Sequence, residues 1–138
     1  MMMKIKRATR VLAAAFFGAA LLTVACKEST GPSTVAGQLT VSVSTSGSGG
    51  AAFLITVSGA GISSPAAANA NHEFYSIISG NTLTAAVITQ SAVTSGNLLR
   101  FSVPDVNQAT SYNVSLVEVA GTDNELLSPS AFTVSATN

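Results

Sequence analysis

The chain of 138 residues contains no tryptophan, one cysteine and one histidine. A single cysteine excludes an intrachain disulfide, so packing and hydrogen bonds must hold the fold together. A zinc site needs several Cys, His or acidic ligands, and a Ser-His-Asp triad needs a base beside its nucleophile. His72 has no G-x-S-x-G motif to accompany it, so we expect a solvated loop histidine, no catalytic residues and no cofactor.

Charged residues are also scarce, at 9% of the chain. Four of the six basic residues lie within residues 4–10, and no acidic residue precedes Glu28. From Cys26 onward, two basic and six acidic side chains give a net charge of −4. Nucleic-acid binding depends on clustered Lys and Arg, so we expect no nucleic-acid partner. A mature chain of 113 residues (26–138) makes a single domain the default.

Residues 1–25 have the composition of a secretory signal peptide. Lys and Arg side chains lead into the apolar stretch Val11–Ala25. As a helix of 15 residues it would span about 22 Å, short of the roughly 30 Å hydrocarbon core of a bilayer. The positive flank and the small residues at its end favour an export signal over a membrane anchor or a buried helix.

The segment Leu22-Thr23-Val24-Ala25-Cys26 resembles the lipobox of bacterial lipoproteins. The resemblance implies cleavage after Ala25, diacylglycerol on the Cys26 sulfur, and an acyl chain such as palmitate on the new amino group. Several chains together anchor a protein stably, where a single chain is marginal. Lys27, where enteric inner-membrane lipoproteins carry Asp, implies the outer membrane or cell surface. Ordinary cleavage after Ala25, leaving Cys26 as a free thiol, is the alternative.

Residues 26–37 follow the signal and have no apolar periodicity. They contain Gly31-Pro32, a turn and breaker signal. We therefore expect a lipidated cysteine and a flexible tether over residues 26–37, and a folded domain over residues 38–138.

The rest of the chain alternates apolar and polar residues, which is typical of strands with one buried face. The predicted strands are centred on Leu39–Val43, Phe53–Val57, Phe74–Ile78, Leu83–Thr89, Leu99–Val103, Tyr112–Val119 and Phe132–Val134, with Leu126-Leu127 as an eighth candidate. Gly80-Asn81 is a two-residue hairpin signal, and Pro104 ends a strand because proline lacks the amide donor. Ser64–Ala68 fits either a short helix with Ser64 as N-cap or a loop.

Seven to eight short strands with frequent turns predict an all-β fold, a single antiparallel β-sandwich. Val106–Leu116 resembles the E–F corner of fibronectin type III and related immunoglobulin-like domains. The resemblance implies that the Tyr112 hydroxyl bonds back to the backbone near Val106 and fixes the corner. A tyrosine half-buried at a strand start, or a cohesin-like sandwich, remains open on the same residues.

Acidic residues are scattered over strand ends and turns, which does not favour a pair of catalytic carboxylates. Asp105, Asp123 and Glu125 are candidates for calcium, because carboxylate oxygens suit a hard cation. Asp and Asn are also common turn formers for hydrogen-bonding reasons of their own.

These features predict a lipid-anchored cell-envelope protein that is not an enzyme. We expect a binding or structural module that presents loops or a sheet edge to another envelope protein or a glycan, with the membrane contacted through Cys26. The alternative is a small envelope enzyme or a calcium-dependent accessory subunit, which Ala substitutions at His72, Asp105 and Asp123 would distinguish by loss of turnover.

Overall fold

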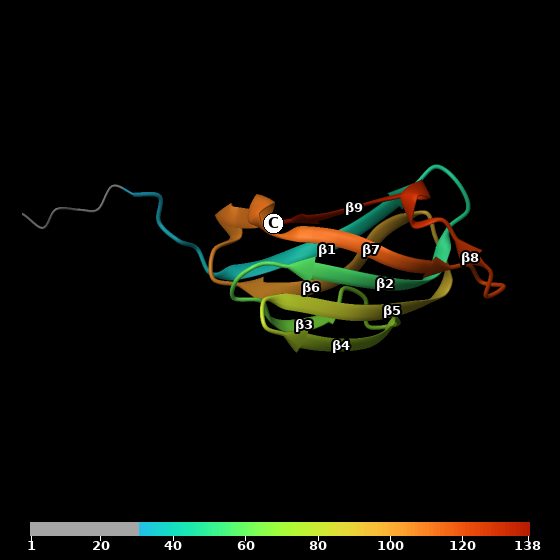
Figure 1. Ribbon diagram of the computed structural model, residues 1–138, viewed down its shortest axis with the longest axis horizontal. Helices are drawn as coiled ribbons and strands as arrows, with labels where there is room; N and C mark the ends of the chain where they lie inside the picture. Colours follow the sequence, from blue (N-terminus) through green and yellow to red (C-terminus); the bar gives the residue numbers. More distant parts are fainter. Residues whose placement is uncertain (1–30) are drawn as a thin grey trace, which may run out of the picture. The chain divides into compact units, whose positions relative to one another are not determined.

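The computed structural model describes residues 31–138, which form two antiparallel β-sheets packed face to face (Figure 1). Every strand pair is antiparallel. The predicted all-β sandwich is therefore confirmed. Within residues 31–138, no helix is long and apolar enough to cross a membrane.

One sheet has four strands in the order β3-β6-β1-β9. Their bounds are β1 Gly37–Thr45, β3 Ser63–Ala67, β6 Ser95–Val103 and β9 Phe132–Thr137. The long strand β1 lies between β6 and β9, so the first and last strands of the sandwich are neighbours.

The other sheet has five strands in the order β4-β5-β2-β7-β8. Their bounds are β2 Gly50–Ser58, β4 Glu73–Ser79, β5 Thr82–Val93, β7 Asn113–Ala120 and β8 Leu126–Leu127. Two short 3₁₀ helices, η1 Val106–Ser111 and η2 Pro129–Ala131, complete the elements. β4 and β5 form the hairpin predicted at Gly80-Asn81, with Ser79 paired to Thr82.

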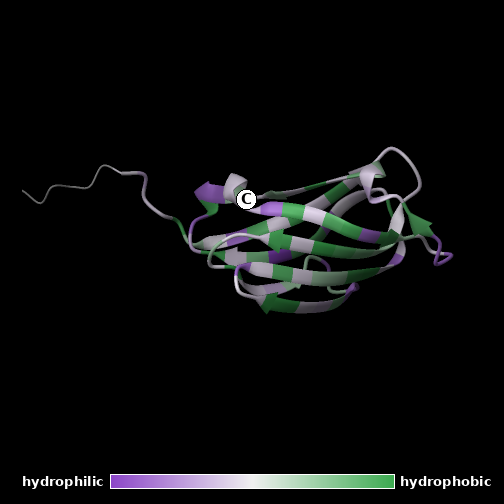
Figure 2. Ribbon diagram, viewed as in Figure 1, coloured by the Kyte–Doolittle hydropathy of each residue, from purple (hydrophilic) through white to green (hydrophobic). Residues whose placement is uncertain are grey.

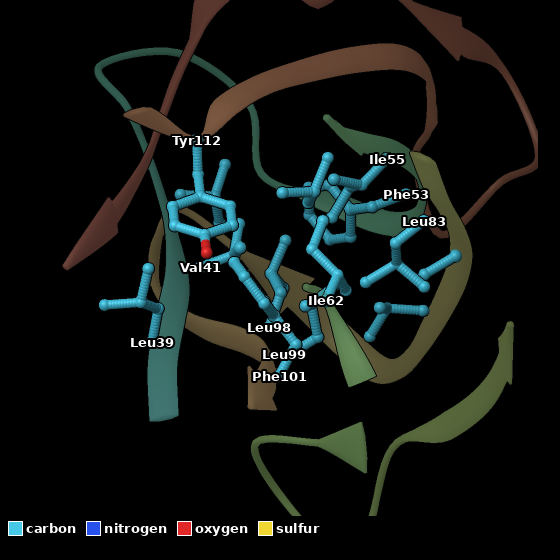
Figure 3. Close-up of a cluster of buried hydrophobic side chains, with 14 of the residues drawn as sticks. Leu39, Val41, Phe53, Ile55, Ile62, Leu83, Leu98, Leu99, Phe101 and Tyr112 are labelled. Atoms are coloured by element: carbon cyan, nitrogen blue, oxygen red, sulfur yellow. The ribbon is translucent and has the colours of Figure 1, made fainter. Parts of the chain in front are cut away.

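The core lies between the sheets because alternate residues of each strand point inward. Figure 2 shows hydrophobic residues interrupted by polar ones along β7. Figure 3 shows the inward side chains of both sheets pointing toward one another. The largest fully buried side chains are Phe53, Phe101, Leu39, Ile55, Leu83, Leu98, Leu99, Val41, Val43, Val57, Val87 and Val119.

The structure differs from the sequence prediction at Ser64–Ala68, where we expected a short helix or a loop. Ser63–Ala67 is instead strand β3, which pairs with β6 at the edge of the four-stranded sheet. The pairing is irregular between Ser63 and Ala66, and Ser64 has a φ of 46°. An edge position tolerates Pro65, which has no amide hydrogen to donate. The sandwich thus has nine strands rather than seven or eight.

Tyr112 joins the end of η1 to the core, but not through the predicted bond. Its hydroxyl donates to the carbonyl oxygen of Ala60, in the β2–β3 loop, at 2.7 Å. The prediction of a bond near Val106 is therefore wrong, and Val106 instead contributes a buried side chain to the core. The Tyr112 ring lies 5.7 Å from the Phe101 ring and so contacts the opposite sheet.

Gly59 is required beneath the Tyr112 ring. A Cβ atom at residue 59 would lie 2.3 Å from Tyr112 Cδ1, far inside van der Waals contact. Partial burial raises the pKa of the Tyr112 hydroxyl, and the nearby negative charge of Asp105 raises it further.

Candidate functional site

The predicted signal peptide over residues 1–25 lies outside the described residues. The cleavage position at Ala25 and the lipidation site at Cys26 lie outside them as well. Both remain predictions.

Asp105 connects the residues before β1 to η1 at one end of the sandwich. Its Oδ1 accepts hydrogen bonds from the backbone amides of Asn107 and Val35, both at 3.1 Å. The Val106 amide in turn donates to the carbonyl of Val35 at 2.8 Å, and Asn107 Nδ2 donates to the carbonyl of Ser33 at 3.3 Å. The last residues before β1 are thus bonded to η1, and one oxygen of this calcium candidate is already occupied.

Asp123 and Glu125 lie in the turn between β7 and β8. Asp123 Oδ1 accepts from the Glu125 amide at 3.2 Å, and the Glu125 carbonyl accepts from the Gly121 amide at 2.9 Å. Asp105 lies before the start of β7 and Asp123 beyond its end, so the eight residues of the strand separate them by about 26 Å. The structure therefore does not bring Asp105 together with Asp123 and Glu125.

No group of three or more His, Cys, Asp or Glu side chains gathers in the part of the chain that the structure describes. His72 lies in a small hollow lined mainly by amide and hydroxyl side chains. Its Nδ1 atom is buried and has no hydrogen-bond partner, and the lining residues include no carboxylate. This hollow therefore lacks the orienting acid of a catalytic triad.

The outer face of the five-stranded sheet carries the most unusual feature of the described surface, which we call the apolar face. Outward positions on a half-exposed sheet normally hold polar residues. The register places apolar residues there from all five strands of the sheet. They are Ala52 and Leu54 of β2, Tyr75 and Ile77 of β4, Ala86 and Ile88 of β5, Ala120 of β7, and Leu126 of β8.

Small side chains at the centre of the apolar face make it concave. Ala86 pairs with Leu54 and Tyr75, and Ala52 pairs with Ala120. Larger side chains surround these alanines, so two shallow hollows form that share Leu54 and Ala86.

The exposure of the large residues at this face is high. Tyr75 is 62% exposed and Ile77 is 67% exposed, while Ile88 is 40% exposed. Glu73 pairs with Ile88, and Glu118 pairs with Leu54, so two carboxylates border the apolar residues. The register gives this face no basic residue.

The outer face of the four-stranded sheet, the polar face, has the opposite character. Its outward positions on β1, β6 and β9 are all polar, and Arg100 is the charged residue among them. They are Gln38, Thr40, Ser42 and Ser44 of β1, Ser95, Asn97, Arg100 and Ser102 of β6, and Thr133, Ser135 and Thr137 of β9.

The apolar face is not predicted by alternation alone, because apolar residues of a strand are expected to face the core. A signal was present in Ala51–Val57 and Ala85–Ile88, whose apolar residues run almost continuously instead of alternating. A strand with apolar residues in both phases has two apolar sides, of which the core covers one.

Comparisons with known proteins give no match, since no family model, curated protein or solved structure is significantly similar to this chain. Function must therefore be inferred from the surfaces of the molecule itself.

Proposed function

We propose that this protein is an exported, lipid-anchored component of a bacterial cell envelope, and that it binds a protein partner through the apolar face. The lipobox-like segment ending at Cys26 supports the anchor, and Lys27 directly after it favours the outer membrane or cell surface. The immunoglobulin-like sandwich is a non-catalytic scaffold in this proposal. The apolar face is the observation that supports binding.

Burial of the apolar face by a partner would remove exposed apolar side chains from water. Tyr75, Ile77 and Ile88 contribute little to the core at their present exposure, and contiguous apolar surface on a monomer marks an interaction site. Aromatic residues such as tyrosine are enriched at protein interfaces relative to the rest of the protein surface. The shallow hollows over Ala86 and Ala52 would accept protruding side chains of the partner.

Charge and composition favour a protein over a glycan. The face offers one aromatic ring, Tyr75, whereas a glycan platform needs several exposed rings. Glu73 and Glu118 at its border favour a partner with an apolar surface edged by Lys or Arg, because complementary charges steer and orient association.

Site-specific photocrosslinking in intact cells tests the binding face. A photoreactive amino acid at Thr84, which lines one hollow, should give a discrete heavier band containing one envelope protein. The matched control is Ser42, an outward residue of the polar face. Equal adducts at both positions, no adduct at Thr84, or adducts only with glycan or lipid would contradict the proposal.

Intact mass of the detergent-extracted protein tests the anchor. We expect the mass of the chain from Cys26 onward plus a diacylglycerol and an acyl group. The Cys26→Ser variant should lose both lipids and leave the membrane fraction. An unmodified Cys26 thiol on the wild-type protein would contradict this part of the proposal.

A further inference from the structure

The four edge strands of the sandwich differ in how well they are protected against pairing with another strand. An unprotected edge presents free backbone amides and carbonyls to other chains, and most proteins block it. β3 carries Pro65 and a positive φ at Ser64, and its pairing is irregular. β8 has two residues. Both features limit the addition of a further strand.

β9 and β4 are longer and regularly paired, but they differ in their exposed side chains. The exposed positions of β9 are Thr133, Ser135 and Thr137, which gain little from burial. β4 exposes Tyr75, Ile77 and Ile78, which are 62%, 67% and 38% exposed. Pairing at β4 would therefore bury apolar surface on both sides of the strand.

β4 also lacks the usual protecting devices. It has seven residues without proline, lysine or glycine, and it pairs with β5 over its whole length without a bulge. Its one charged residue, Glu73, is at its first position. Among the edges of the described residues, β4 alone is regular, apolar and unprotected.

We propose that β4 pairs antiparallel with β4 of a second copy of this chain, about a two-fold axis through Ser76. Ser76 is the middle residue of Glu73–Ser79, so this register pairs the whole strand with itself. The two five-stranded sheets then become one continuous sheet, and isologous contact closes the assembly as a dimer.

This register matches apolar residues on both sides of the strand. Tyr75 lies opposite Ile77 of the second copy on the outer side, which is an aromatic and β-branched pair of the stabilising kind. Phe74 lies opposite Ile78 of the second copy on the inner side, so both partly exposed residues become covered. Glu73 lies opposite Ser79, and no like charges face each other.

Slipping the register loses this match. An axis through Tyr75 places Glu73 opposite Ile77 of the second copy, and an axis through Ile77 places Tyr75 opposite Ser79. The strand is thus complementary to itself in one register, which favours a second copy over an unrelated strand. This inference goes beyond the proposed function, because it requires neither the lipid anchor nor a partner on the apolar face.

Disulfide trapping of the full chain, expressed in cells and oxidised before extraction, tests the dimer. Opposed residues of antiparallel strands have Cα atoms about 4.5–5.5 Å apart, within the range that a disulfide spans. The Ser76→Cys variant should therefore convert to a species of twice the monomer mass on a non-reducing gel. The matched control is Ser79→Cys, whose two copies would lie about 20 Å apart and should stay unlinked. The wild-type chain reports any background from Cys26.

Three results would overturn the proposal. They are a Ser76→Cys variant that remains monomeric, one that links to a different protein, and a Ser79→Cys control that links equally well.

A second pair of variants separates specific pairing of β4 from disulfides formed by random collision of two chains. Adding Ile77→Lys to the Ser76→Cys chain places a charge on the paired edge and should abolish the linked dimer. Adding Thr84→Lys places the same charge on the adjacent strand, opposite Ile77 but away from the edge, and should leave the dimer intact. Circular dichroism should show folded protein in both cases. Equal dimer yield from both double variants would overturn the proposed pairing.

Discussion

The apolar face and the polar face are built on the same alternating strands, but their outward positions carry different side chains. On β1, for example, Thr40 and Ser42 point outward between buried neighbours. On β2, the equivalent outward positions hold Ala52 and Leu54. Both sheets bury the same kind of residue inward, so the difference lies wholly on the outside.

This comparison separates what the fold needs from what it does not. A sandwich needs apolar residues on the two inner faces. The polar face shows that Ser and Thr are sufficient at the outward positions of a sheet in this chain. The apolar residues on the other face are thus additional to the requirement for folding. Their exposure carries the functional proposal.

The largest expected effects come from the inner faces, where the two sheets should behave alike. Leu39→Ala in β1 and Ile55→Ala in β2 each remove a fully buried side chain, one from each sheet. Each should lower the free energy of unfolding by about 3–4 kcal/mol, through lost burial and a residual cavity. Urea denaturation followed by circular dichroism measures this. A small loss in one sheet alone would show that the sheets do not share one core.

A smaller loss of stability is expected from the hydrogen bond between Tyr112, which follows η1, and the β2–β3 loop. Tyr112→Phe removes the donor to the Ala60 carbonyl and should lower the free energy of unfolding by about 1–2 kcal/mol. Urea denaturation at neutral pH measures it. A loss near zero would mean that water replaces the hydroxyl.

The same tyrosine predicts a dependence on alkaline pH. Its pKa is raised in the folded state, so folding favours the protonated phenol. This contribution is fully present below the ordinary pKa of about 10 and is lost as the pH rises through the folded-state pKa. Unfolding curves between pH 8 and 12 should therefore show a loss of stability that is weaker in Tyr112→Phe. Identical pH profiles would assign the loss to other groups.

A still smaller loss of stability is expected from substitution of Asp105. Asp105→Ala removes the acceptor for the Val35 and Asn107 amides and should lower the free energy of unfolding by about 1 kcal/mol. Asp105→Asn keeps an acceptor oxygen and is the matched control. Because of this structural role, loss of any activity in Asp105→Ala is not a sign of catalysis. Equal effects of Ala and Asn would point to the charge rather than the hydrogen bonds.

The smallest expected effects on stability come from the outer faces themselves. Leu54→Ser converts a central position of the apolar face to the chemistry of the polar face and should change the free energy of unfolding by less than about 1 kcal/mol. It should nevertheless remove the photocrosslink formed from Thr84. A destabilisation as large as that of Ile55→Ala would show that the fold depends on the apolar face as much as on the inner faces. It would contradict the view that these outward residues are not needed for folding.

Most strands of the fold could be predicted from the sequence because their period is local. Leu39, Val41 and Val43 report a buried side without reference to any other strand. β3 could not be predicted in this way, because Ser63–Ala67 has no β-branched or aromatic residue and proline at its centre. It is a strand because β6 presents it with a partner, and that information lies over 30 residues away.

The functional surfaces depend on long-range register even more strongly. The role of Tyr112 at a corner was predictable, but its acceptor lies 52 residues earlier and no local motif specifies it. The apolar face arises only when β4, β5, β2, β7 and β8 align, because each strand contributes one or two residues. The proposed tether shows the same limit, since Ser33 and Val35 bond to residues 70 or more positions later.

The fit of Gly59 beneath the Tyr112 ring has a consequence for the history of this domain. A methyl group at residue 59 would overlap the ring. A smaller residue at position 112 would leave a void and leave the Ala60 carbonyl without its hydrogen-bond donor. A substitution at either position is therefore unfavourable while the residue at the other position is unchanged. Descendants of this chain should therefore retain both residues or replace both, and single exchanges should be rare among them.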